Sequence, residues 1–76
     1  MNIEIQYCGV WNYLPKASRL EDELKKSFAS VKINLIKGSG GIFIVSVDGE
    51  AIFDKSDLLR FPNDNEITKL IENKSS

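Results

Sequence analysis

The hydrophobic pattern changes between Tyr7 and Pro15, and this change constrains the fold more than any other feature. Before it, Ile3 and Ile5 alternate with polar residues, which is the two-residue period of a strand with one buried face. After it, apolar residues recur every three or four positions, as on one face of a helix. The chain therefore passes from a strand into a helix, and Cys8, the only cysteine, lies at the junction.

The helical pattern extends over residues 12–30. We expect Asn12 to be the N-cap and Pro15 to lie in the first turn, where the missing N–H of proline costs no hydrogen bond. The expected apolar stripe comprises Leu14, Ala17, Leu20 or Glu21, Leu24 and Phe28.

Three strands are predicted after this helix. Residues 31–36 alternate, and a strand that follows a helical crossover pairs in parallel with the first strand. Residues 42–47 are almost continuously apolar, so we expect a central strand that is covered on both faces. Asp48 and Gly49 favour a tight hairpin turn with positive φ at both residues, which leads into a return strand over residues 51–53.

The end of the chain contains a connector and a final helix. Residues 54–62 lack a periodic pattern, and the sequence indicates no role for the adjacent Leu58 and Leu59. Asn63 or Asp64 can cap the final helix, with Glu66 in capping-box register to Asn63. The apolar stripe of this helix is Ile67, Leu70 and Ile71.

The predicted order of elements is strand, helix, strand, strand, strand, helix. This β-α-β-β-β-α order indicates an α/β (α+β) fold in which a four-stranded mixed sheet has two helices on one face. We expect residues 1–76 to form one domain, because a chain of 76 residues has room for only one hydrophobic core.

The composition excludes several classes of partner. Ten Lys and Arg are interleaved with eleven Asp and Glu, which gives a net charge of -1. The chain is therefore not expected to have the basic face that nucleic-acid binding requires. No apolar run approaches the roughly 18 residues of a membrane-spanning helix, so no membrane association is expected. One Cys and no His predict neither a metal site nor a bound cofactor, and the absence of a cysteine pair favours a reducing cytoplasm. The sequence makes no prediction of the oligomeric state.

Two blocks of residues resemble the selenoprotein W family, also called the Rdx group. The first block is Tyr7-Cys8-Gly9 with Tyr13, Pro15 and Lys16, and the second is Gly38-Ser39-Gly40-Gly41-Ile42-Phe43 with Val45, Val47, Gly49 and Lys55. The resemblance spans most of the chain and implies a thioredoxin-like fold with a role in thiol redox chemistry. The family pattern is a Cys, two residues, and then a second Cys or a selenocysteine, and Trp11 occupies that last position here.

Cys8 is the candidate nucleophile. It lies just before an expected helix N-terminus, where unpaired backbone N–H groups favour a thiolate. The alternative is a small buried apolar side chain, which is the commoner role of a lone Cys. Because Trp11 cannot attack sulfur, a mixed disulfide on Cys8 must be resolved by glutathione or by a partner protein thiol. We therefore expect at most a weak monothiol oxidoreductase in cell redox homeostasis, with glutathione as a co-substrate.

The alternative function is a non-enzymatic interaction module that has lost the redox pair. Tyr7, Trp11 and Tyr13 would then form an aromatic docking surface around Cys8 and Gly9, since aromatic side chains are favoured at protein interfaces. The other interpretation of Trp11 is structural, with the indole filling space over the first helix or the sheet edge.

Ser39 and Gly40 belong to a second candidate loop. This glycine-rich segment is followed by a strand and lacks the Lys of a phosphate-binding loop, so we expect it to serve a backbone that needs positive φ or close approach. The resemblance implies that it lies near the Cys8 loop, and Ser39 and Gly40 are therefore candidate binding residues.

Overall fold

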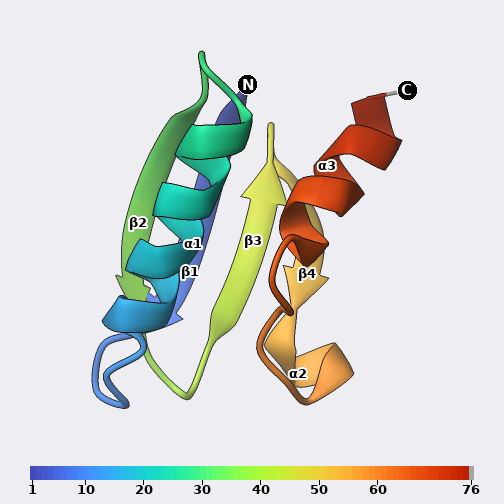
Figure 1. The fold of residues 1–76 in the computed structure, drawn as a ribbon. Helices are drawn as coiled ribbons and strands as arrows, with labels where there is room; N and C mark the ends of the chain where they lie inside the picture. Colours follow the sequence, from blue (N-terminus) through green and yellow to red (C-terminus); the bar gives the residue numbers. More distant parts are fainter. Residues whose placement is uncertain (76) are drawn as a thin grey trace.

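The computed structural model describes residues 1–75, without the side chain of Ser75, and the last residue of the predicted domain, Ser76, lies outside the described residues. The elements, in chain order, are β1 (Asn2–Cys8), α1 (Leu14–Ser27), β2 (Lys32–Gly38), β3 (Phe43–Val47), β4 (Glu50–Asp54), α2 (Lys55–Leu58) and α3 (Glu66–Ser75) (Figure 1).

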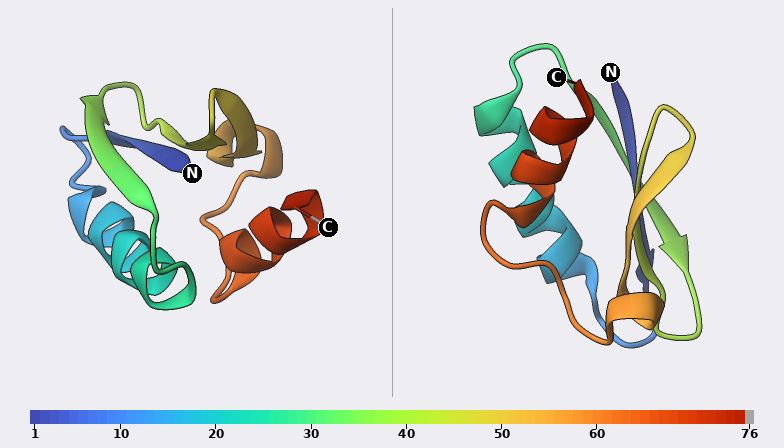
Figure 2. Two further views of the ribbon diagram at one scale, coloured as in Figure 1. Left: turned by 90° about the horizontal axis from the view of Figure 1, so that it is seen from above. Right: turned by 90° about the vertical axis from the view of Figure 1, so that its right-hand side faces the viewer.

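The four strands form one mixed sheet in the order β2-β1-β3-β4. β1 pairs in parallel with β2 and antiparallel with β3, and β3 pairs antiparallel with β4. Figure 2 shows α1 and α3 on the same face of this sheet. The predicted mixed sheet with both long helices on one face is therefore confirmed.

The core lies between the sheet and these two helices. Ile5 of β1 is opposite Val45 of β3, and both are fully buried. The helices cover this face with a second set of buried residues, namely Ala17, Leu20, Leu24, Ile67 and Ile71. Alternating side chains of the two central strands thus reach the same core.

The prediction that β3 is covered on both faces is wrong. Phe43, Val45 and Val47 are buried against the helices, whereas Ile44 and Ser46 are only half-buried on the opposite face. Ile44 is an apolar residue on the side without helices, and it makes the run look continuously apolar. A short run of this kind has the same sequence pattern whether one or both of its faces are covered.

The limits of α1 also differ from the prediction. Asn12 has a φ of 57°, in the left-handed region, and does not cap the helix. Tyr13 is the N-cap and makes no side-chain capping bond, while Pro15 lies in the first turn as expected. The helix ends at Ser27, because Phe28 adopts an extended backbone that continues toward β2.

The connector contains a short helix that the sequence pattern did not reveal. One carboxylate oxygen of Asp54 accepts the backbone N–H of Ser56 at 2.9 Å and its hydroxyl at 2.7 Å, which starts α2. Leu59 ends this single turn with a φ of 58°. Four residues are too few to show helical periodicity, so the capping Asp was the only available signal.

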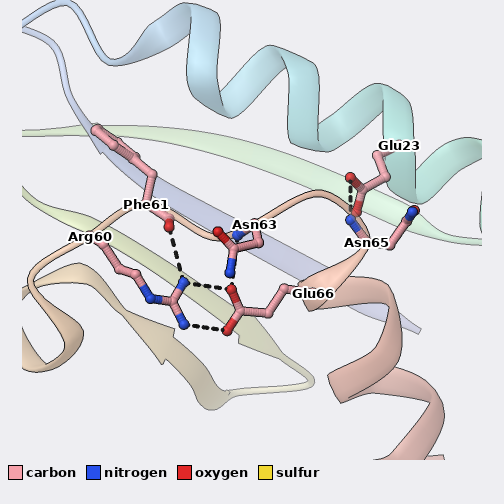
Figure 3. A network of polar contacts seen from close by, with 6 residues as sticks. All are labelled: Glu23, Arg60, Phe61, Asn63, Asn65 and Glu66. Atoms are coloured by element: carbon pink, nitrogen blue, oxygen red, sulfur yellow. Dashed lines mark hydrogen bonds and ion pairs between the residues drawn. The ribbon is translucent and has the colours of Figure 1, made fainter.

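An ion pair between Arg60 and Glu66 fastens the connector to α3 (Figure 3). The two guanidinium nitrogens donate to the two carboxylate oxygens at 2.7 and 2.9 Å, and the backbone N–H of Asn63 also donates to Glu66. The predicted contact of Glu66 with the Asn63 N–H is therefore present, but α3 begins at Glu66 itself, so Asn63 and Asp64 lie before the position that caps the helix. The hydrogen bonds from Arg60, followed by that from Asn63, lower the pKa of Glu66 to about 2.

Glu66→Gln is expected to reduce stability in a pH-dependent way. A carboxylate whose pKa is lowered by folding stabilises the native state above its unfolded pKa of about 4.3, and this contribution disappears as the pH falls toward the folded value. Urea unfolding of both proteins should therefore give a stability difference that is constant near neutral pH and shrinks between about pH 4 and pH 2.

The matched control for this prediction is Glu72→Gln, which removes an exposed carboxylate elsewhere on α3. A stability difference between wild type and Glu66→Gln that did not change with pH would contradict the role of the ionised carboxylate.

Candidate functional site

Cys8 is the last residue of β1 and lies opposite Gly38 of β2. Its predicted place at the strand-to-helix junction is confirmed. The side chain is fully buried, but among the described residues it does not belong to the main core cluster. Strand alternation explains this, since Ile5 and Tyr7 face the helices and Cys8 falls on the other side of the sheet. The sulfur is therefore buried outside the main core cluster.

The segment that follows Cys8 folds back over it through backbone hydrogen bonds. The N–H of Tyr13 donates to the carbonyl of Cys8 at 3.0 Å, and the N–H of Asn12 donates to the carbonyl of Gly9 at 3.1 Å. The N–H of Trp11 lies 3.4 Å from Cys8 Sγ and donates to it. The donor to the sulfur thus comes from this loop, before the first turn of α1.

The Trp11 ring joins this loop to the glycine-rich loop between β2 and β3. A Cβ atom on Gly41 would lie only 2.4 Å from Trp11 Cζ3, so the ring rests directly on the Gly41 backbone. Gly40 and Gly41 both have positive φ, at 72° and 75°, as expected for this loop. The two loops are therefore in contact, as the resemblance implied.

Aromatic rings continue from Trp11 into the protein. Trp11 meets Tyr13 edge-to-face at 6.0 Å between ring centroids, and Tyr13 meets Phe61 in the same way at 4.7 Å. Phe61 then contacts Phe43 of β3 at 5.2 Å. Phe61 was missed in the sequence analysis because it lies in an irregular connector where no periodic pattern indicates its neighbours.

The predicted docking residues have different exposures. Trp11 is 59% exposed, and Ser39 and Gly40 are exposed beside it. Tyr13 and Gly9 are half-buried. Tyr7 is half-buried and packs against the main core.

No group of three or more Cys, Asp or Glu side chains is placed to hold a metal ion in residues 1–75. In the same part of the chain, no helix has the length and apolar character needed to cross a membrane.

Comparison with known proteins places this arrangement in a family. The model of the Rdx family matches residues 2–73, which is nearly the whole chain. The chain belongs to the Rdx family. The family is redox-related, and the fold of this Rdx chain is thioredoxin-like.

Solved structures agree with the assignment to the Rdx family. A crystal structure of a protein from Bordetella parapertussis has a TM-score of 0.91 and 27% sequence identity, covering 96% of this chain and 95% of its own. A selenoprotein W-related protein from Vibrio cholerae has a TM-score of 0.89 and 23% identity, covering 99% and 96%. A search of curated proteins found no match.

Substitution of Gly41 is expected to displace the Trp11 ring in this Rdx protein. Gly41→Ala and Gly40→Ala should each lose roughly 1 kcal/mol of stability, because both residues have positive φ. Only in Gly41→Ala does the new methyl group also clash with the Trp11 ring, since nothing lies within 4 Å of a Cβ on Gly40. Trp11 fluorescence should therefore change in Gly41→Ala and stay as in wild type in Gly40→Ala. The same emission spectrum in both variants would contradict the contact.

Proposed function

We propose that this Rdx protein is a single-thiol redox protein of the reducing cytoplasm, in which Cys8 forms mixed disulfides with glutathione or with a partner protein. The observation that supports it best is the hydrogen bond from the Trp11 N–H to Cys8 Sγ, at the end of the strand that leads into α1. This bond brings a backbone donor of the loop to within 3.4 Å of the sulfur. Trp11 thus provides a donor where the family pattern has a second sulfur.

The proposed reaction is an exchange that requires an external thiol. The Cys8 thiolate attacks one sulfur of oxidised glutathione, the disulfide bond of glutathione breaks, and one glutathione leaves as a thiolate. A second thiolate, from glutathione or a partner protein, then attacks the mixed disulfide and releases Cys8 as a thiolate. The electrons balance in each step, because every new S–S bond replaces a broken one.

The burial of Cys8 means that the loop must open before exchange. The loop from Gly9 to Tyr13 contacts the sulfur through the Trp11 N–H, and it is held by a few backbone hydrogen bonds and by the contact of Trp11 with Gly41. Trp11 itself is largely exposed, so its ring can move without opening the main core. Opening of this loop is therefore expected to limit the reaction rate.

Treatment with oxidised glutathione is expected to add one glutathione to Cys8, as measured by intact-protein mass spectrometry. Cys8→Ser should give no adduct. Trp11→Ala should form the adduct several-fold faster than wild type, because it removes the ring that holds the loop against Gly41. Absence of the adduct in both wild type and Trp11→Ala at near-neutral pH would refute the proposed reaction.

A non-enzymatic docking module is the second candidate, favoured by the exposure of Trp11 at 59%. The two functions differ in their dependence on sulfur. Binding by a docking module survives Cys8→Ser and is weakened by Trp11→Ala, whereas mixed-disulfide formation is abolished by Cys8→Ser.

A further inference from the structure

The Cys8 loop (residues 9–13) and the glycine-rich loop (residues 39–42) both belong to segments without acidic residues. The chain has no Asp or Glu over residues 5–20 or over residues 24–47, although it contains eleven of them in total. Because the two loops are in contact, this part of the surface has no carboxylate from either segment. A protein with a net charge of -1 thus has a local excess of positive charge around its cysteine.

Three lysines, Lys16, Lys37 and Lys55, lie near these two loops. The aliphatic chain of Lys37 lies over Gly9, where a Cβ atom would approach Lys37 Cε to 2.4 Å. Lys16 and Lys55 lie on the Phe61 ring, with Nζ 5.2 and 5.3 Å from its centroid. Within residues 1–75 none of the three forms an ion pair. They are held by carbon and ring contacts. α2 and its N-cap add two carboxylates to this end, Asp54 and the exposed Asp57, so three lysines against two acids leave a net charge of +1.

The exposed apolar side chains of the protein are concentrated at the same end. Of eight large hydrophobic residues that are exposed in the described chain, five belong to the Cys8 loop with the start of α1 and to the end of α2; they are Val10, Trp11, Leu14, Leu58 and Leu59. Both groups lie at the lower end of the molecule in Figure 1. Lys55 Nζ lies 5.7 Å from the centroid of the Tyr13 ring, which connects α2 to the Cys8 loop.

We propose that this end surface, formed by the five apolar residues and the three lysines, docks an acidic polypeptide segment that presents apolar side chains. Exposed apolar side chains gain free energy when covered, and an acidic segment supplies the carboxylates that the lysines lack. The idea that such a segment also exchanges its thiol with Cys8 rests on the proposed function, whereas the docking itself does not. A polypeptide fits better than a nucleic acid, because three lysines on an acidic protein are far fewer than a phosphate backbone requires.

Binding of short synthetic peptides to the Cys8→Ser protein tests this proposal without redox chemistry. The probe is a fluorescein-labelled peptide in which Leu and Phe are flanked by Glu and Asp, with Ser in place of Cys. Two matched peptides replace the acids by Gln and Asn, or the Leu and Phe by Ala. Fluorescence anisotropy should show that the acidic apolar peptide binds about tenfold more tightly than either, and that added salt reduces its advantage over the neutral peptide.

Protein variants identify the surface that is used. Lys16→Gln, Lys37→Gln and Lys55→Gln in one protein should abolish the preference for the acidic peptide. The control changes Lys26, Lys32 and Lys69 to Gln, which removes the same charge from exposed lysines elsewhere and should leave the preference intact. Trp11→Ala should weaken binding several-fold, and thermal unfolding checks that each variant is folded.

Three outcomes would overturn the docking proposal. They are equal affinity for the acidic and neutral peptides, equal loss of affinity in the two triple variants, and tighter binding of a single-stranded oligonucleotide than of the acidic peptide. If the glutathione adduct forms on Cys8 but the acidic peptide has no advantage, only the docking surface is refuted. If the peptide binds as predicted but no adduct forms, the thiol function alone fails.

Discussion

The contact between the Trp11 ring and the Gly41 backbone is the interaction on which the candidate site depends. Only glycine allows the ring to approach this closely, since any Cβ at position 41 would lie 2.4 Å from it. Trp11 also donates its backbone N–H to Cys8 Sγ. Trp11 therefore contacts the sulfur through its backbone and joins the two loops through its side chain.

The second half of the chain provides the residues that pack against the Cys8 loop. Tyr13 lies between Trp11 and Phe61, and Phe61 is held in an irregular connector rather than in a helix or strand. The adjacent Arg60 donates to the Phe61 carbonyl and pairs with Glu66 at the start of α3 (Figure 3). Glu23 of α1 accepts the backbone N–H of Asn65, which joins the same connector to α1. The residues that support the loop are thus linked to both long helices.

Patterns with a local physical cause were predictable from the sequence. The alternation around Ile5, the positive φ of Asp48 and Gly49, and the contact of Glu66 with a backbone N–H all depend on neighbouring residues, and all are present. The contact of the Cys8 loop with the glycine-rich loop followed from the family resemblance.

Features that depend on distant parts of the chain were not predictable. The burial of Cys8 depends on how the following loop folds back, and the position of Phe61 depends on an ion pair formed in the finished fold. The left-handed Asn12 was mistaken for a helix cap, because Asn is favoured in both conformations. The short α2 and the uncovered side of β3 were missed because neither gives a distinct period.

Local opening of the Cys8 loop is the central claim, and the rate at which a small thiol reagent labels Cys8 at increasing urea concentration tests it most directly. Opening of the loop alone exposes little surface, so the labelling rate should hardly change at low urea and should exceed the rate that global unfolding allows. A labelling rate that rises with urea as steeply as global unfolding, down to the lowest concentration, would show that Cys8 is accessible only in the unfolded chain and would contradict the claim.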